Sequence, residues 1–253
     1  MLKNFITELG SITIFFAKSI SYLFTPPFRT SLIFKQMEFA GIKSFFAVII
    51  TGIFIGMVVA LGSYVGFMKF GAEEWLGSTV ALAVVAQLAP VITAFVVSAK
   101  VGAAYAAELG TMRVTEQIDA LEVMAINPIQ YLVTSRFLAC IVMMPILTIF
   151  CDVSGVLAGY LASTKILGIN PGAYMSNTIE VVDFSDILRG ILRSVTFGFL
   201  IPIIACYKGF YTKGGAEGVG RAVTETVVIC IIIVLIDNYV FTCIFNYLIF
   251  WPF

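Results

Sequence analysis

The chain has 253 residues, of which 60% are hydrophobic and only 12% carry a charge. Soluble domains are about half apolar and about a quarter charged, so this composition indicates an integral membrane protein and argues against a separate soluble domain. Lysine and arginine together number 15, as do aspartate and glutamate, which leaves no overall field to attract nucleic acid. The sequence contains no histidine, the commonest general base and metal ligand.

The N-terminal 43 residues have the pattern of segments that lie at a membrane surface. Apolar residues from Phe5 to Leu23 recur at spacings of three and four, which is typical of an amphipathic interfacial helix. Pro26 and Pro27 are expected to end this helix, because proline lacks an N–H and restricts the residue before it. The mixed polar segment that follows, up to Lys43, is also expected at the surface.

Residues 44–253 form a predicted domain of five membrane-spanning helices. A span needs roughly 20 apolar residues, and five such runs cover about residues 44–68, 78–99, 137–162, 187–207 and 223–249. Glycines four residues apart permit close helix packing at Gly52/Gly56, Gly62/Gly66 and Gly155/Gly159. Pro90 breaks the second run and is tolerated only where protein or water satisfies the carbonyl group that it frees.

The basic residues orient these spans across the membrane. Eleven of the 15 lysines and arginines fall in the N-terminal segment, in residues 100–136 and in residues 208–221. The other four, Lys69, Lys165, Arg189 and Arg193, fall on the opposite side of the predicted spans. Cytoplasmic loops carry an excess of lysine and arginine, so the N-terminus and the two charged segments are predicted to be cytoplasmic.

The most informative polar segment, Glu108 to Ile126, lies between the second and third predicted spans and stops at Asn127-Pro128. It is too short and too highly charged for a span. On a helix, its charged residues would spread over one side and the apolar face would hold Val114, Ile118, Leu121 and Ala125. Periodicity leaves two interpretations open: a solvated helix that lies on the membrane, or a coupling helix that docks into a cytoplasmic partner.

An ordered set of motifs then runs from Gln87 to Ala162. It comprises Leu88-Ala89-Pro90, Lys100-Val101-Gly102-Ala103, AELGTMRVTEQ from Ala107 to Gln117, LEVMA from Leu121 to Ala125, Asn127-Pro128 and Ser135-Arg136-Phe137. Through these motifs the chain resembles the MlaE (YrbE) permease family of MCE-type lipid ABC transporters. The plan of a surface helix and five spans agrees with the family along the whole chain, with weaker similarity at the two ends.

Three positions depart from the pattern common in that family. Gln87 stands where a glutamate is common, Lys100 where an arginine is common, and Asn127 where an aspartate is common. The glutamine removes a charge at membrane depth, while the helix break at Pro90 is kept.

The resemblance implies an all-α permease subunit of the bacterial inner membrane. Two copies would pair through their spans, a separate cytoplasmic ATPase would use ATP and Mg²⁺, and lipid would pass to or from a periplasmic MCE-domain protein. The sequence has no P-loop of the form GxxxxGK[ST], so ATP chemistry must come from the partner and no cofactor is expected on this chain. Residues 108–126 would be the coupling helix, with docking residues Glu108, Gly110, Met112, Arg113, Glu116, Gln117, Asp119 and Leu121.

Polar groups at membrane depth are the candidates for the lipid path, because an ionisable side chain in hydrocarbon is costly unless it faces protein or water. Arg189 and Arg193 could attract a lipid phosphate, snorkel to the headgroups, or pair with Asp183 or Asp186. Asp152 and Asp237 could pair with an arginine, bond across helices or line a wet cavity. An apolar pocket wall with few polar groups would add Val58, Leu61, Tyr64, Gln87 and Pro90.

Two other classes of function compete with a lipid permease. A stand-alone secondary transporter or channel would use Asp152, Asp237 and the broken second span, but such folds show paired halves and no repeat is visible here. A membrane-embedded enzyme acting on lipid would need a catalytic constellation, and the sequence has neither histidine nor Gly-x-Ser-x-Gly.

Overall fold

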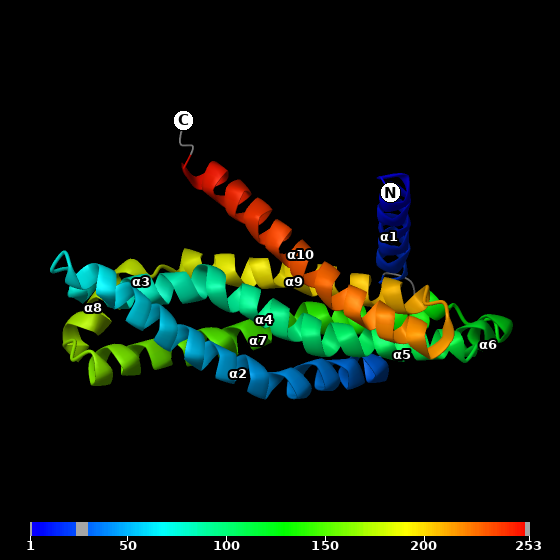
Figure 1. Cartoon of the computed structure of the whole chain (residues 1–253), viewed down its shortest axis with the longest axis horizontal. Helices are drawn as coiled ribbons and strands as arrows, with labels where there is room; N and C mark the ends of the chain where they lie inside the picture. Colours follow the sequence, from blue (N-terminus) through cyan, green and yellow to red (C-terminus); the bar gives the residue numbers. More distant parts are fainter. Residues whose placement is uncertain (1, 24–29, 251–253) are drawn as a thin grey trace. The chain divides into compact units, whose positions relative to one another are not determined.

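The computed structural model describes residues 2–23 and 30–250, and these are helical apart from short connections (Figure 1). The predicted helix break at Pro26 and Pro27 lies outside the described residues. In chain order the helices are α1 (Leu2–Leu23), α2 (Thr30–Met68), η1 (Glu73–Trp75), α3 (Leu76–Ala83), η2 (Val84–Leu88), α4 (Ala89–Val97), η3 (Ser98–Gly102), α5 (Ala103–Val114), α6 (Gln117–Val123), η4 (Ile129–Val133), α7 (Thr134–Leu161), η5 (Ala162–Ile166), α8 (Pro171–Val181), α9 (Phe184–Phe210) and α10 (Gly215–Phe250).

Five helical stretches among the described residues are long and apolar enough to cross a membrane, as predicted. They are Thr30–Met68, Glu73–Val114, Ile129–Ile166, Phe184–Phe210 and Gly215–Tyr247. Each extends beyond the apolar run that predicted it. The reason is that hydropathy marks only the part within hydrocarbon, whereas backbone hydrogen bonding continues the helix into the headgroup region and water.

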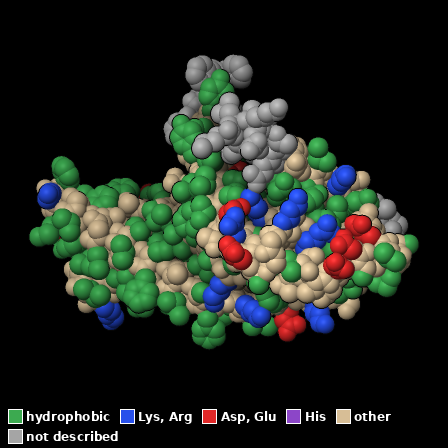
Figure 2. Space-filling model, turned by 45° about the vertical axis from the view of Figure 1, so that its right-hand side comes forward, with side chains coloured by type: hydrophobic (Ala, Val, Ile, Leu, Met, Phe, Trp, Pro, Cys, Tyr) green, Lys and Arg blue, Asp and Glu red, His purple; other side chains and the backbone are tan. Residues whose placement is uncertain are grey.

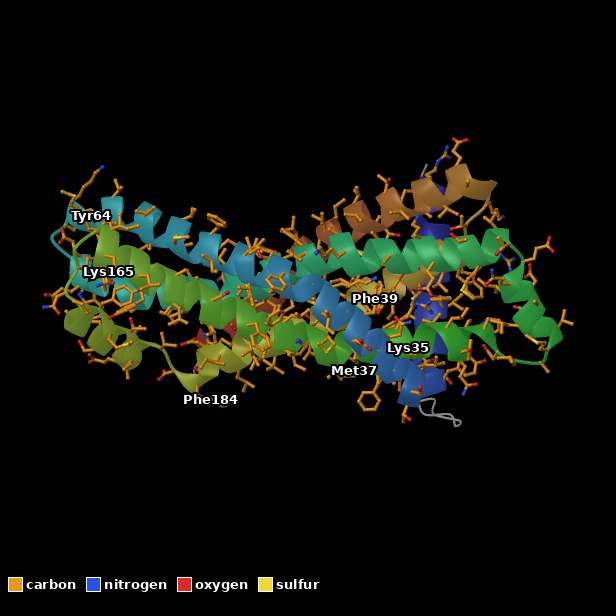
Figure 3. The ribbon with its side chains drawn as sticks, turned by 90° about the horizontal axis from the view of Figure 1, so that it is seen from below. Lys35, Met37, Phe39, Tyr64, Lys165 and Phe184 are labelled. Carbon is orange, nitrogen blue, oxygen red and sulfur yellow. The ribbon has the colours of Figure 1, made fainter. Side chains whose placement is uncertain are left out.

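Helix α2 shows this extension most clearly. It begins at Thr30, so the predicted division after Lys43 falls inside a continuous helix. In Figure 3, Lys35 and Phe39 lie in the first part of α2 and Tyr64 lies near its end. The first span and the polar segment before it are therefore parts of one helix.

The chain divides into two compact units. The first comprises Met1–Lys43, Val97–Met143 and Thr196–Phe253, and the second comprises Ser44–Val96 and Met144–Val195. Eleven of the 15 lysines and arginines belong to the residue ranges of the first unit, the same residues that the positive-inside count assigned to one side.

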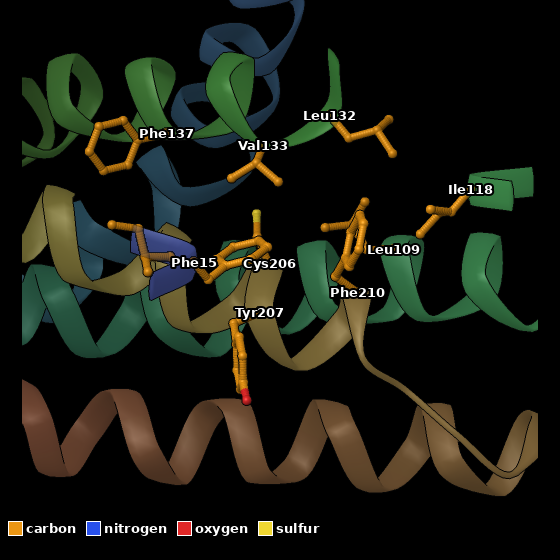
Figure 4. Packing of buried hydrophobic residues seen from close by; sticks show 10 residues of the cluster. Phe15, Leu109, Ile118, Leu132, Val133, Phe137, Cys206, Tyr207 and Phe210 are labelled. Carbon is orange, nitrogen blue, oxygen red and sulfur yellow. The ribbon is translucent and has the colours of Figure 1, made fainter. Parts of the chain in front are cut away.

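The first unit has an apolar core that ties α1 to the ends of the spans. Phe15 of α1 is 2% exposed and its ring lies 5.7 Å from that of Tyr207 and 5.9 Å from that of Phe210 (Figure 4). The other buried members come from α5, α6, η4, α7 and α9, and they are Leu109, Ile118, Leu132, Val133, Phe137, Ile203 and Cys206. One cluster thus holds the N-terminal helix, the charged segment and three spans.

The second unit depends on glycines where α2 crosses α7. A Cβ atom added at Gly56 would lie within 2 Å of the carbonyl oxygen of Gly155, and one added at Gly52 would lie 2.4 Å from Oγ of Ser154. The predicted close packing at Gly52/Gly56 and Gly155/Gly159 is confirmed. Gly62 and Gly66 have no atom within 4 Å of such a Cβ among the described residues, so close packing at this pair stays a prediction.

Gly56 and Gly62 offer a matched pair for testing this crossing. We expect Gly56→Ala to lower the free energy of unfolding by about 3 kcal/mol, because the methyl group must push two backbones apart. Gly62→Ala should leave stability unchanged or raise it by up to about 1 kcal/mol through helix propensity. Thermal unfolding of the two variants in the same detergent measures both effects, and equal melting temperatures would contradict this account of the crossing.

Candidate functional site

The charged segment between the second and third spans is folded into two helices, not the single helix predicted for Glu108 to Ile126. Helix α5 continues the second span as far as Val114, the chain turns at Glu116, where φ is +58°, and α6 runs from Gln117 to Val123. Ala125, with φ of +57°, follows the end of α6. The predicted bounds are therefore wrong.

The physical reason lies in the burial of Leu109 and Ile118. Both are fully buried in the core of the first unit. They are nine residues apart, and at about 100° per residue a continuous helix would point them in opposite directions. The turn at Glu116 lets both side chains enter one core.

A buried arginine joins α5 to the start of α7. The Arg136 side chain is 3% exposed, and its Nη2 lies 2.8 Å from Oε2 of Glu108, which is half exposed. Its Nη1 donates to the carbonyl of Leu132 at 2.7 Å, and the guanidinium lies 5.4 Å from the ring centre of Tyr105. Arg136 was part of the family motif, but nothing in the sequence indicated that Glu108 was its partner.

The far end of this segment exposes a mixed charged and apolar surface, which we call the α5–α6 surface. Val123 is 88% exposed and Met124 is 60% exposed, and Glu116 and Glu122 on the same segment are also exposed. Figure 2 shows charged side chains of both signs gathered on one part of the visible face. An exposed apolar patch ringed by charge is the usual composition of a protein-binding site.

The predicted docking residues do not all belong to this surface. Arg113 forms an ion pair with Asp119, and both lie at the surface with Gln117. Met112 and Leu121 pack against the core. Gly110 is buried, with the hydroxyl of Thr212 3.1 Å from where its Cβ would be.

The second unit shows how the break at Pro90 is accommodated. Proline has no N–H, so the carbonyl group of Ala86, four residues earlier, loses its helical donor. Nη1 of Arg193 donates to this oxygen at 2.6 Å, and Arg193 is 4% exposed. Protein or water was expected to satisfy the freed carbonyl, and here a protein side chain does so. The donor is one of the residues proposed for the lipid path.

The other polar candidates differ in their surroundings. Nη1 of Arg189 lies 3.4 Å from Oδ1 of Asp186, which is one of the two pairings expected from the sequence. In the first unit, Oδ2 of Asp237 accepts a hydrogen bond of 2.7 Å from Thr196 across α9 and α10. Asp152 of the second unit is 8% exposed, and its Oδ1 accepts no hydrogen bond from the described residues.

The apolar candidates lie in two environments. Val58 is 65% exposed, Leu61 is 42% exposed and Tyr64 is partly buried along α2. Gln87 is exposed in η2, a turn of π-helix, while Pro90 is buried and lies next to Gly190. Within the second unit, Arg193 contacts the carbonyl of Ala86, which lies between Val85 and Gln87 in the turn before Pro90.

Glu108 can be tested against Glu116, an exposed carboxylate on the same segment. We expect Glu108→Gln to lower the free energy of unfolding by about 2 kcal/mol, because it leaves the Arg136 charge buried without its counter-ion. The loss is smaller than for a fully buried pair, because solvent screens the half-exposed carboxylate. Glu116→Gln should change it by less than about 0.5 kcal/mol. Thermal unfolding in detergent provides the comparison, and a similar shift in both variants would count against a specific role for the pair.

The hydrogen bond to the freed carbonyl can be isolated with a double-mutant cycle. We expect Arg193→Met to cost about 2 kcal/mol when Pro90 is present, because the Ala86 carbonyl is then left unsatisfied. In a Pro90→Ala background, the restored N–H can satisfy that carbonyl, so the cost of Arg193→Met should fall by half or more. Equal costs in the two backgrounds, measured by thermal unfolding, would show that Arg193 stabilises the protein in some other way.

The chain is similar in sequence to known permeases. Residues 33–244 match the family described as Permease MlaE. The chain is 42% identical to a probable ABC transporter permease protein of Rickettsia conorii, over 96% of this chain and 93% of the relative. It is 34% identical to the intermembrane phospholipid transport system permease protein MlaE of Haemophilus influenzae, over 96% of this chain and 98% of the relative. It is 36% identical to the chloroplastic protein TRIGALACTOSYLDIACYLGLYCEROL 1 of Arabidopsis thaliana, over 83% of this chain and 60% of the relative.

These matches agree with the resemblance on which the sequence prediction was based. They confirm the predicted class, a multi-pass ABC transporter permease. As a permease of this kind, it depends on an ATPase partner. The chain belongs to the MlaE permease family.

Proposed function

We propose that this chain moves phospholipid, or a related lipid, between a bacterial inner membrane and a periplasmic MCE-domain protein. A separate cytoplasmic P-loop ATPase binds ATP and Mg²⁺ and drives the movement. The Haemophilus influenzae relative named as part of an intermembrane phospholipid transport system supports the choice of substrate.

The α5–α6 surface is the observation that carries the ATPase-docking part of the proposal. It exposes Val123 and Met124 among carboxylates, at the end of a helix continuous with the second span. Because α5 is part of that span, a displacement of the surface would move the span with it. Arg136 and the core around Ile118 would transmit the same displacement to α7. In this proposal, the α5–α6 surface acts as the coupling segment.

The charge distribution supports the proposed orientation. The ranges of the first unit hold most of the basic residues and also contain the α5–α6 surface. The positive-inside rule then makes the N-terminus and the ATPase-docking surface cytoplasmic. Residues 1–43, the last of which already belong to helix α2, would serve as the membrane-surface segment, and residues 44–253 as the five-span permease domain.

A second copy of the chain is part of the proposal. Only 11% of the most apolar window of Gly215–Tyr247 is buried within the chain, and only 22% of that of Thr30–Met68. These two spans have the most surface available to a partner copy or to lipid. The span Thr30–Met68 carries Val58, Leu61 and Tyr64, which we assign to the wall of the lipid path.

Asp152 is the polar residue that best fits the lipid path. Arg193 donates a hydrogen bond to the Ala86 carbonyl, Arg189 forms an ion pair with Asp186, and Asp237 accepts a hydrogen bond from Thr196. Asp152 is buried, and its Oδ1 accepts no hydrogen bond from the described residues. A buried polar group of this kind is costly, so a partner outside the chain, such as a lipid headgroup, would stabilise it. Gln87 and Pro90 complete the proposed path.

Charge reversal on the α5–α6 surface tests the docking of the ATPase. We expect Glu116→Lys with Asp119→Lys to lower co-purification of the co-expressed ATPase at least tenfold, since like charges would replace complementary ones. Glu73→Lys with Glu74→Lys makes the same change of charge in the second unit and should leave co-purification unchanged. An intact complex with the first pair would contradict docking at this surface. Lipid mass spectrometry of the purified complex identifies the substrate class.

A further inference from the structure

The first unit contains a cavity of about 790 Å³ that lies apart from the α5–α6 surface and from the proposed lipid path. It lies where α9 ends and α10 begins, and α1 contributes Ser11 to its wall. Three cationic side chains, two carboxylates and two tyrosines account for most of its polar lining: Lys208, Lys213, Arg221, Glu217, Glu225, Tyr207 and Tyr211. Its volume is within the range of small-molecule sites, about 300–1,000 Å³.

The lengths of the adjoining helices place this cavity at the level of the lipid headgroups. Helix α9 has 27 residues, which corresponds to about 40 Å, and a bilayer with its headgroups is about 40–45 Å thick. Helix α10 begins at Gly215, only a few residues after α9 ends at Phe210. Since both helices cross the membrane, the turn that joins them lies at the membrane surface, and the cavity opens beside that turn.

The cations of the cavity are engaged to different degrees. Lys208, whose side chain is 12% exposed, has its Nζ 2.9 Å from Oε2 of Glu225. Arg221 lies 3.5 Å from Glu217, but both side chains are more than two-thirds exposed, and an exposed pair of this kind contributes little. Lys213 is exposed and makes no ion pair with the residues that the structure describes. Lys213 and Arg221 are therefore available to bind an anion.

The tyrosines suit an amphiphilic ligand. Tyr207 is 8% exposed and points from α9 toward α10 (Figure 4), while Tyr211 is 54% exposed. Tyrosine is enriched where one end of the ring meets apolar chains and the hydroxyl meets headgroups. Basic pockets between membrane helices are suited to phosphate-bearing headgroups.

From these features we propose that the cavity binds a phosphate group, with Lys213 and Arg221 as its counter-charges and Tyr207 and Tyr211 against the rest of the ligand. The phosphate can be that of an anionic phospholipid headgroup or of a soluble phosphate ester. Phosphate binding in this cavity does not depend on the docking of an ATPase. A failure of the docking proposal would therefore leave this proposal intact, and a failure of this proposal would leave the docking proposal intact.

Native mass spectrometry of the full chain, released from detergent and titrated with dioleoyl phosphatidylglycerol, tests this proposal. We expect one tightly bound lipid whose apparent affinity falls about thirtyfold in the Lys213→Gln, Arg221→Gln double variant, since two basic residues near a membrane surface together contribute about 2 kcal/mol. Lys69→Gln with Lys165→Gln removes the same charge from exposed positions of the second unit and should leave that affinity unchanged. Thermal unfolding checks that both double variants are folded.

Two further ligands separate the possible outcomes. Dioleoylglycerol, which lacks the phosphate, should not occupy the site, and equal binding of the two lipids would overturn the proposal. An equal loss of affinity in the two double variants would also overturn it, because net charge alone would then explain the binding. Displacement of the lipid by glycerol 3-phosphate would assign the site to soluble phosphate esters, and its failure to compete would assign the site to membrane lipid.

Discussion

Pro90 removes one backbone N–H from the second span, and the carbonyl of Ala86 that it leaves free accepts a hydrogen bond from Arg193. In hydrocarbon a carbonyl group without a donor is costly, and here another helix supplies the donor. The same requirement governs the first unit, where Glu108, the Leu132 carbonyl and the Tyr105 ring surround the buried Arg136. Each unit therefore contains a cation whose position is determined by the backbone or carboxylate that it satisfies.

These two cations have different consequences for movement. Arg193 stabilises a break within the second unit, next to a turn of π-helix. Arg136 joins α5 to the beginning of α7, at the end of the segment that carries the α5–α6 surface. In the proposed coupling role, a force applied to that surface would reach α7 through one ion pair and the core around Ile118, and α5 is itself the end of the second span. The described contacts therefore tie the surface to two spans.

Much of this fold follows from patterns that the sequence makes visible. Five apolar runs predict five spans because hydrocarbon demands them, and Gly52/Gly56 predicts a close crossing because only glycine leaves room for it. The helix ends were harder to predict, because the positions of Leu109 and Ile118 are set by packing in the tertiary core and not by the local helical period. Helix α8 was missed, although Asn170-Pro171 is a recognisable start: Oδ1 of Asn170 accepts from the N–H of Gly172 at 2.8 Å.

Partners distant in sequence could not be named from the sequence. The local chemistry of Pro90 required a donor for the Ala86 carbonyl, but nothing near it indicated a residue more than 100 positions away. Conversely, Arg193 could be assigned to lipid phosphate only while its partner was unknown.

Burial and pairing separate the basic residues that hold the fold from those that can bind a ligand. Arg136, Arg193 and Lys208 have side chains that are largely buried and contact an acceptor within 3 Å. Substitution of such a cation leaves its acceptor unsatisfied. The effect of the substitution on binding therefore cannot be separated from its effect on folding. Lys213 and Arg221 are exposed at the end of two spans, where loss of charge has little effect on stability. A change in lipid affinity on substituting these two residues therefore reports on the ligand itself.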